Sequence, residues 1–444
     1  MNRARRLPKD PGPAGWNCLL PEPDRVQRLE EDLTADWLIV GAGFAGLSAA
    51  RRLCQLCPED RIVILDATRV GQGPAGRNSG FMIDLPHDLS SANYSGAAEN
   101  DLAEIEDNRR ALTFAHETAT AFGLPQEAIR RVGKVNGAAS QKGVKHNHDY
   151  KAHLDKIGEE NRLLDASQMR ALTGTDYYQS GLYTPGTMML QPAMYVRGIA
   201  QGLRSNRVQI FEHSPVLALE RKAYWVAKTP KGTVRAPKVI LAVNGHLQSF
   251  GHMGGRLIHT HTYASMTRAL SQDEILHLGG ERNWDITPAD PLGTTVRRIS
   301  GTGGDRIVIR NRFTYDPGLE PGRKWITQIS RDHDASFHAR FPMLNNVEME
   351  YRWGGRLCLS LNGVQVIQEL ESGMFSACCQ NGLGTARGTL AGMLAAEMAC
   401  GIGSPALDRA LASASPSRLP PSVLSSLGAN ARLRWGEFRA GREK

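Results

Sequence analysis

The residues best suited to chemistry are three glycines and one carboxylate near the start of the chain. Gly41, Gly43 and Gly46 follow an apolar run at 37–40, and Asp66 ends the next apolar run. In this spacing the first glycine permits a tight turn, the second lets the backbone approach a pyrophosphate, and the third lets a helix pack on the strand. The helix N-terminus then faces the phosphate charge, and the carboxylate accepts ribose hydroxyls. The pattern predicts a dinucleotide site.

A second glycine-rich segment, at 71–80, follows that carboxylate. It places a cation, an amide and a hydroxyl between two glycines: Gly76, Arg77, Asn78, Ser79 and Gly80. The first motif alone serves both FAD and NAD. The second segment favours a flavin, because its polar groups are suited to meet phosphate oxygens or a flavin ring.

Two strand–turn–helix units must position these residues. The first runs from a strand at 37–40 through the glycine turn to a helix at 45–56 and a second strand at 61–65. The other has a strand at 374–378, a glycine turn and a helix at 385–399. Apolar strands joined by helices predict a parallel sheet that is covered on both faces.

The rest of the chain changes period between helix and strand. Helical spacing occurs at 101–122 and 194–203, and Ser271 with Glu274 forms a capping box that opens a further helix. Short strands are expected in a meander that returns to the main sheet, at 208–211, 216–219, 224–227, 233–236 and 239–243. Strand-like pieces within 256–350 predict a second sheet, and they include 294–298 and 306–310.

Five further segments resemble one flavoprotein family. They are 163–166, 181–183, 237–245, 351–355 and 390–392. Together with the glycine segments they resemble the D-amino acid oxidase-like FAD-dependent oxidoreductases, especially the gamma-glutamylputrescine oxidase branch, with glycine and sarcosine oxidases as relatives. The resemblance implies FAD and an α/β fold, in which a Rossmann-like FAD-binding domain of glutathione reductase type joins a mixed-sheet α+β substrate domain.

The resemblance also implies further cofactor residues. Beyond the residues already named, they are Phe44, Ala45, Ala67, Val216 near the adenine, Ala242 and Gly245 on the pyrophosphate side, Trp353, and Gly382, Leu383, Gly384 and Thr385. The last four bring a helix N-terminus toward the flavin pyrimidine. We expect an extended surface arm at 1–34, an FAD-binding domain from 35–95, 185–255 and 351–405, a substrate domain from 96–184 and 256–350, and a tail at 406–444 that packs back at Trp435.

The chain departs from the family pattern at three places. Leu383 stands where many members have histidine, and Gly363 where many have proline. The glycine-oxidase branch grips the substrate carboxylate with an arginine two residues after the glycine of its Trp-x-Gly motif, where this chain has Leu357 and places Arg356 one position early. We therefore expect the helix dipole alone to stabilise reduced flavin at this turn, and no clamp for an α-carboxylate.

The resemblance implies oxidation of a small amine, such as a polyamine derivative or a secondary amine. Hydride would pass from the carbon next to nitrogen to flavin N5, and water would hydrolyse the resulting imine. The electron acceptor is oxygen or another compound. The alternative is a flavin-binding subunit or structural partner of a larger complex without turnover of its own. No catalytic residue is assigned, and the candidates for the substrate side are Tyr263, Arg312 and Tyr315.

Composition makes several partner classes unexpected. A net charge of +8 is spread over 444 residues, which does not favour nucleic acid binding. Apolar stretches are far shorter than the roughly 20 residues that span a bilayer. Seven scattered cysteines suit a reducing cytoplasm. His252, His259 and His261 have no acidic or thiol partner at ligand spacing, so we expect no metal.

Two sets of residues keep open interpretations. Four arginines alternate on expected strands: Arg297, Arg298, Arg310 and Arg312. Their partner is either a substrate anion or solvent. Tyr263, Phe313 and Tyr315 either wall an amine pocket or belong to the core, the commoner place for aromatic strand residues.

Overall fold

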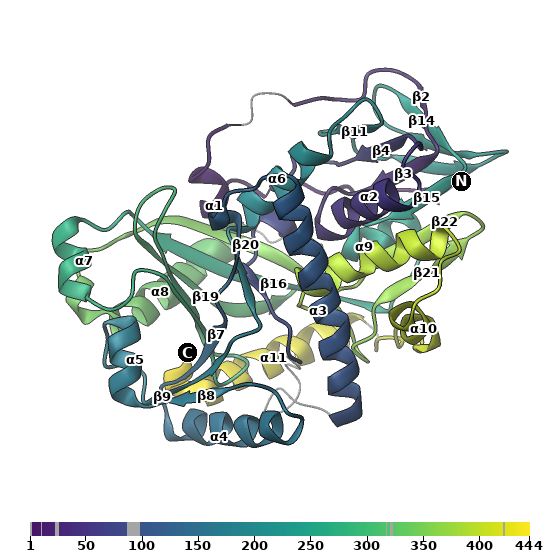
Figure 1. Cartoon of the computed structure of the whole chain (residues 1–444). Helices are drawn as coiled ribbons and strands as arrows, with labels where there is room; N and C mark the ends of the chain where they lie inside the picture. Colours follow the sequence, from purple (N-terminus) through teal and green to yellow (C-terminus); the bar gives the residue numbers. More distant parts are fainter. Residues whose placement is uncertain are drawn as a thin grey trace.

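One half of the molecule is built on a six-stranded sheet (Figure 1). The computed structural model describes residues 2–9, 11–22, 26–86, 98–316, 318–319, 323–420 and 422–444. The strand order is β11 (Val208–Phe211), β4 (Ile62–Leu65), β3 (Trp37–Val40), β15 (Lys238–Leu241), β22 (Met374–Cys378) and β21 (Val366–Glu371). The first five are parallel and β21 is antiparallel. The predicted parallel sheet is confirmed.

The central strands of this sheet are apolar on both faces, and helices cover one of these faces. All four residues of β3 and all four of β4 are buried. The covering helices are α2 (Phe44–Leu56), α3 (Ala98–Ala121), α6 (Pro192–Leu203), α9 (Ala386–Ala399) and α10 (Pro405–Ala412). Gly392 lets α9 approach α2 closely, since a Cβ there would lie 2.1 Å from the Ala45 carbonyl oxygen.

A five-stranded sheet that packs against the main sheet contains three strands of the predicted meander, whereas the predicted strand at 208–211 is β11, an edge strand of the main sheet itself. Its order is β1 (Asn2–Arg3), β12 (Ala218–Arg221), β13 (Trp225–Lys228), β14 (Thr233–Ala236) and β2 (Leu33–Thr34). The two outer strands come from the N-terminal segment. β14 has the predicted bounds, whereas β12 begins two residues later than predicted, so that Val216 precedes the strand.

The other half is an eight-stranded mixed sheet. Its order is β20 (Met349–Ser360), β16 (Leu257–Thr267), β19 (Arg306–Tyr315), β18 (Thr295–Ile299), β17 (Trp284–Pro288), β7 (Lys134–Ala138), β9 (Ser180–Thr184) and β8 (Arg162–Leu164). Around it lie α4 (Gln141–Lys156), α5 (Ala166–Thr173), α7 (Gln272–Leu278), α8 (Arg323–Arg340) and α11 (Ser422–Ala440). The predicted capping box of Ser271 and Glu274 opens α7.

Small elements join the two halves. β5 (Phe81–Met82), β10 (Met188–Leu190) and β6 (Ile129–Arg131) form a three-stranded sheet. The short helical turns are η1 (Pro74–Gly76), η2 (Gln126–Ala128), η3 (Asn244–Phe250), η4 (Pro342–Leu344) and η5 (Gly441–Glu443).

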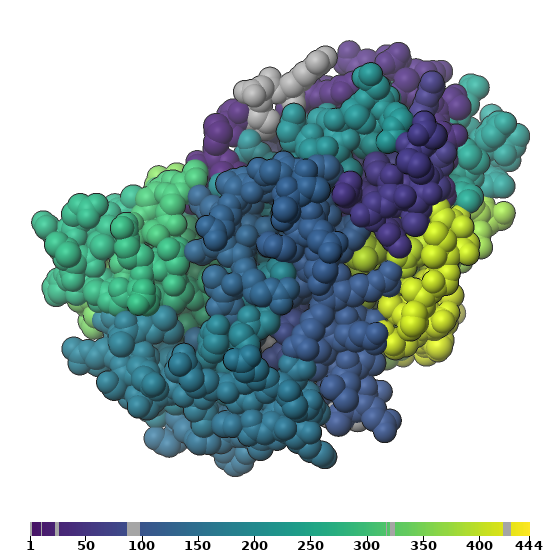
Figure 2. All heavy atoms as spheres, viewed as in Figure 1, coloured from purple at the N-terminus to yellow at the C-terminus, as the bar shows by residue number. Residues whose placement is uncertain are grey.

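Figure 2 shows blue residues of the α3 to α5 region over the centre and lower part of one face, with yellow residues of the α9 and α10 region at its right.

The N-terminal segment is not simply an extended surface arm. It contains α1 (Gly15–Cys18), and the Trp16 side chain is 1% exposed because it packs against Trp353, with their ring centroids 6.3 Å apart. An indole that finds both an aromatic neighbour and a hydrogen-bond acceptor is stable inside a protein.

The C-terminal tail also differs from the expectation that it packs at Trp435. The Trp435 side chain is 62% exposed on α11, whereas Glu437 is buried and pairs with Arg312. Residues two apart on a helix point in nearly opposite directions, so a helix that turns Glu437 inward turns Trp435 outward.

In the described ranges, no helix combines the length and apolarity needed to cross a membrane. We propose that the two halves correspond to the predicted FAD-binding and substrate domains, although 351–360, predicted in the FAD-binding domain, lie in β20 of the eight-stranded sheet.

Candidate cofactor and active site

The glycine turn after β3 leaves room beside the N-terminus of α2. Gly41 has φ +104°, and a Cβ there would lie 2.6 Å from the Ala242 carbonyl oxygen. A Cβ on Gly46 would lie 1.8 Å from the Gly41 carbonyl oxygen, so both positions require glycine for packing. A Cβ on Gly43 would meet only Ala75, at 3.6 Å, and Gly43 caps α2 without any side-chain hydrogen bond. This end of α2 is therefore open to a phosphate.

Asp66 stands at the end of β4 and faces the same turn. Its carboxylate accepts hydrogen bonds from the backbone N–H groups of Ala42 and Thr68, each at 2.8 Å. Burial raises the pKa of Asp66, and these hydrogen bonds oppose that rise. The carboxylate holds the glycine turn and the next turn of the chain together, at the place predicted for the ribose.

The loop at 71–80 is held by its own side chains and by the second sheet. The Asn78 amide donates to the Ala75 carbonyl at 2.7 Å and accepts from the Gly80 N–H at 2.8 Å. Arg297 donates to the Ser79 carbonyl at 2.7 Å. A Cβ on Gly80 would lie 2.1 Å from the Arg297 guanidinium, so close approach requires glycine here.

The structure does not place the Arg77 guanidinium at a phosphate position. Arg77 is buried and donates to the carbonyls of Gly354 and Gly12, both at 2.7 Å. Trp353 in turn donates to the Arg77 carbonyl at 2.9 Å. These two predicted cofactor residues instead bind the loop to β20 and to the N-terminal segment.

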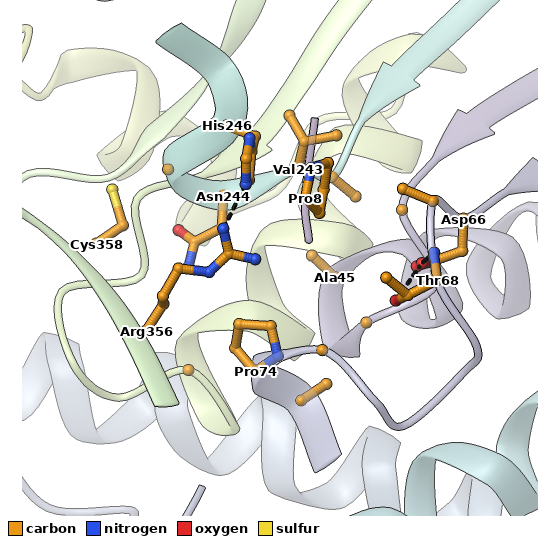
Figure 3. Close-up of a pocket in the computed structure, with 18 of the residues that line it drawn as sticks. Pro8, Ala45, Asp66, Thr68, Pro74, Val243, Asn244, His246, Arg356 and Cys358 are labelled. Carbon is orange, nitrogen blue, oxygen red and sulfur yellow. Dashed lines mark hydrogen bonds between the residues drawn. The ribbon is translucent and has the colours of Figure 1, made fainter. Parts of the chain in front are cut away.

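One cavity gathers most of the predicted cofactor residues (Figure 3). Those that line it are Gly41, Gly43, Phe44, Ala45, Asp66, Ala67, Asn78, Ser79, Val216, Ala242, Gly245, Gly382, Gly384 and Thr385. Those that do not are Gly46, Gly76, Arg77, Gly80, Trp353 and Leu383. A backbone-rich lining with one carboxylate and an open helix N-terminus fits a dinucleotide.

A second helix N-terminus, that of α9, also meets the cavity. Thr385 precedes α9, makes no side-chain cap, and donates its hydroxyl to the Phe81 carbonyl at 2.6 Å. Gly382 has φ +86° and lines the cavity. Leu383 does not, because its side chain points into an apolar cluster with Phe81 and Leu182. Of the predicted cofactor residues at this turn, Leu383 is thus the one that does not line the cavity.

The end of the cavity opposite Asp66 carries a group of cationic and imidazole side chains. Arg356 donates to the Leu319 carbonyl at 3.1 Å and is hydrogen-bonded to the His246 ring. Nearby, the ring of His259 is 2.8 Å from the Gln248 amide oxygen. Burial, together with the positive charges of His246 and Arg356, lowers the pKa of His259 to about 4.

Sequence reasoning missed this group. It noted Arg356 only as displaced from a family position, and it did not single out His246. The alternation of a strand was the available signal: Arg356 lies three residues after Trp353 on β20, so the two side chains point to opposite faces. Trp353 faces the core, which turns Arg356 toward the cavity.

The predicted substrate residues lie elsewhere. The Tyr263 hydroxyl is buried 2.7 Å from the Thr314 hydroxyl, and Tyr315 pairs through its backbone with Asn430. Arg312 forms ion pairs with Asp332 and Glu437. None of the three lines the cavity, because this part of β16 and β19 packs under α8 and α11.

The other arginines on these strands also bind protein groups. Arg297 forms a buried ion pair with Asp285, and Arg298 donates to the Gly279 carbonyl. The Arg310 guanidinium lies 4.6 Å from the centre of the Phe313 ring. Each of these arginines therefore contacts another group of the protein. Among the described residues, no group of histidine, cysteine, aspartate and glutamate side chains is placed to hold a metal ion.

Comparisons with known proteins agree with this architecture. The chain is 26% identical over 389 residues to the gamma-glutamylputrescine oxidoreductase of Escherichia coli (strain K12), covering 83% of this chain and 84% of the relative. Its fold is similar to that of glycine oxidase from Geobacillus kaustophilus, with a TM-score of 0.67, 17% identity, and coverage of 84% and 96% of the two chains. L-amino acid deaminase from Proteus myxofaciens gives a TM-score of 0.67 at 15% identity, with 87% and 96% covered.

Residues 36–398 match the model of one family, DAO, described as FAD dependent oxidoreductase. This match covers the strands and helices that line the cavity from β3 to α9. FAD is therefore the cofactor that the cavity has to fit, and the chain belongs to the DAO family of FAD-dependent oxidoreductases.

Proposed function

We propose that the protein oxidises a small amine at the carbon next to nitrogen, with a polyamine derivative or a secondary amine as substrate. The observation that supports this most is the single cavity that joins the dinucleotide turn to the loop at 71–80 and to the α9 N-terminus. An amine is favoured because the relative with 26% identity over 83% of this chain is named for gamma-glutamylputrescine.

The chain contributes binding and orientation. In this proposal, the N-terminus of α2 and Gly43 would hold the diphosphate, Asp66 would bind the ribose, and the N–H groups before α9 would be the donors for the flavin pyrimidine. FAD, when bound, supplies a hydride acceptor for the carbon next to the amine nitrogen. His259, with a pKa of about 4, is neutral near pH 7 and so adds no positive charge to the cavity.

The test is anaerobic reduction of the purified yellow protein. We expect monoamines, diamines or N-acylated diamines to bleach the flavin absorbance, and glycine and lactate to do so slowly or not at all. Rapid bleaching by glycine or lactate with none by amines would overturn the choice of substrate. Failure of every compound, with dithionite still reducing the flavin, would favour a flavin-binding subunit without turnover.

Two further properties belong to the same proposal. Admitting air to the substrate-reduced protein distinguishes oxygen from another electron acceptor by the rate at which the yellow colour returns. We also propose a reducing, cytoplasmic setting, in keeping with seven cysteines that are all unpaired.

A further inference from the structure

The N-terminal segment passes over the cofactor cavity. Ala4, Arg6, Leu7 and Pro8 are among its lining residues. In Figure 3, Pro8 lies between the end that carries Asp66 and Thr68 and the end that carries Arg356 and His246. We call residues 2–9 and 11–20 the arm. From the sequence, this segment was expected only to lie on the surface.

The beginning of the arm, residues 2–5, is fixed to the protein by backbone hydrogen bonds. β1 pairs with β12 through Asn2 and Arg3. The next two N–H groups also have partners, since Ala4 donates to the Leu217 carbonyl and Arg5 to the Ser249 carbonyl, both at 2.9 Å. The chain therefore enters the cavity from a hydrogen-bonded strand.

The arm is fixed again after the residues that line the cavity, at Gly12, Trp16 and Asn17. Here its groups form hydrogen bonds with the loop at 71–80. The Gly12 carbonyl accepts from Arg77 at 2.7 Å, and the Trp16 indole donates to the Asn78 carbonyl at 2.8 Å. Asn17 donates to the Gly71 carbonyl at 2.8 Å.

The Trp16 anchor is itself clamped by the second sheet. Its indole packs against Trp353, and the Arg297 guanidinium lies 5.1 Å from the centre of the ring. Arg297 also binds Ser79 in the loop, so the arm, the loop and the second sheet form one connected structure.

We propose that the arm is part of the cofactor site and retains FAD, with residues 4–8 as a strap over the bound cofactor and Arg6 as a positive charge beside it. A ligand under a strap anchored at both ends leaves only when one anchor opens, so the strap acts mainly on the rate of dissociation. This inference rests on FAD occupying the cavity, as proposed above.

The first experiment measures FAD release from the full-length holoprotein by the rise in flavin fluorescence after dilution. We expect the double variant Arg6→Ala, Leu7→Ala to release FAD several-fold faster, and Trp16→Ala by about tenfold or more. The control is Arg3→Ala, which removes a charge of the same arm at an exposed position that lies outside residues 4–8 and does not line the cavity, and which should release FAD at the wild-type rate. Since Trp16 is buried and its replacement can impair folding, the exposed double variant is the decisive one.

A second measurement needs no substitution. Trypsin cleaves after arginine and lysine, and the arm offers Arg3, Arg5, Arg6 and Lys9. We expect bound FAD to slow cleavage at these sites, followed by mass spectrometry, relative to protein stripped of FAD. Equal cleavage in both forms, together with equal release rates in the Arg6→Ala, Leu7→Ala variant and wild type, would overturn the strap. If Gly43→Val keeps its FAD, the placement of the cofactor itself fails instead.

Discussion

At the scale of single residues, the three glycines of the first turn have different structural roles. Gly41 and Gly46 are fixed by the surrounding backbone, whereas Gly43 faces open space. A larger side chain at Gly43 leaves the protein fold undisturbed and occupies the room reserved for the cofactor. Position 43 therefore separates cofactor binding from folding better than its neighbours do.

We predict that Gly43→Val yields a folded, colourless protein, because the isopropyl group takes the space of the pyrophosphate. Asp66→Ala should also lose FAD, since the ribose loses its acceptor and the glycine turn loses its hydrogen bonds. Flavin absorbance and circular dichroism of the purified variants measure the two effects. Gly403→Val is the control, because a Cβ there meets nothing within 4 Å. A full flavin spectrum in Gly43→Val would show that the pyrophosphate lies elsewhere.

Leu383 gives a second prediction at this scale. Its side chain is 8% exposed in an apolar cluster, so Leu383→His places an imidazole among apolar groups. We expect the free energy of unfolding to fall by about 2–3 kcal/mol, and the flavin midpoint potential to stay near its wild-type value. Urea unfolding and a redox titration measure these quantities. A marked rise in the potential without loss of stability would place residue 383 at the flavin after all.

At the scale of elements, the close contact of α2 and α9 brings two helix N-termini to one cavity. We predict that Gly392→Ala lowers the free energy of unfolding by about 2 kcal/mol or more, because its methyl group would collide with the Ala45 carbonyl. Alanine otherwise favours a helix by about 1 kcal/mol over glycine. Gly428→Ala in α11 is the matched control: with open space around it, it should gain stability. If urea unfolding gave equal changes in the free energy of unfolding at both positions, helix propensity alone would account for the effect of Gly392→Ala.

The elements that could be predicted are those whose signal is local. β3, α2, β22 and α9 follow from short apolar runs, glycine turns and helical spacing, and their observed bounds lie within one residue of those expected. The dinucleotide turn could be predicted for the same reason.

What could not be predicted depends on distant partners. Arg312 is neutralised by Glu437, 125 positions away, and Arg77 is taken up by Gly354 and Gly12. Trp435 looked like an anchor because it is aromatic, but only the register of α11 decides which face is buried. No spacing in the sequence records these pairings.

At the scale of the whole molecule, two long strands connect the halves. β16 and β20 pair along their length in the second sheet, and their His259 and Cys358 ends reach the cofactor cavity. α8 packs against the same strands, where Ser265 on β16 is hydrogen-bonded to His333 at 2.7 Å. Besides the buried His261, two imidazoles thus lie along β16: that of His259 on the strand itself, near the cavity, and that of His333, which belongs to α8.

These imidazoles predict how stability depends on pH. Burial lowers the pKa of His259 to about 4 and that of His333 to about 3, with Arg356 and Arg352 respectively among the positive neighbours that act in the same direction. Between these values and the ordinary 6.5, the unfolded chain binds protons that the folded chain does not. Stability is therefore complete above about pH 6.5 and is lost as the pH falls toward the folded pKa values.

We expect each histidine to remove about 2 kcal/mol from the free energy of unfolding between pH 7 and pH 5. His259→Gln and His333→Gln should each reduce that loss by about this amount, because glutamine keeps a polar side chain and does not titrate. Urea unfolding of each variant and of wild type at both pH values, with FAD in excess, measures the difference. His116→Gln, at an exposed position of α3, is the control and should keep the wild-type pH dependence. If the two buried variants also keep it, the imidazoles bind protons equally in the folded and unfolded chains, and acid sensitivity must come from the carboxylates.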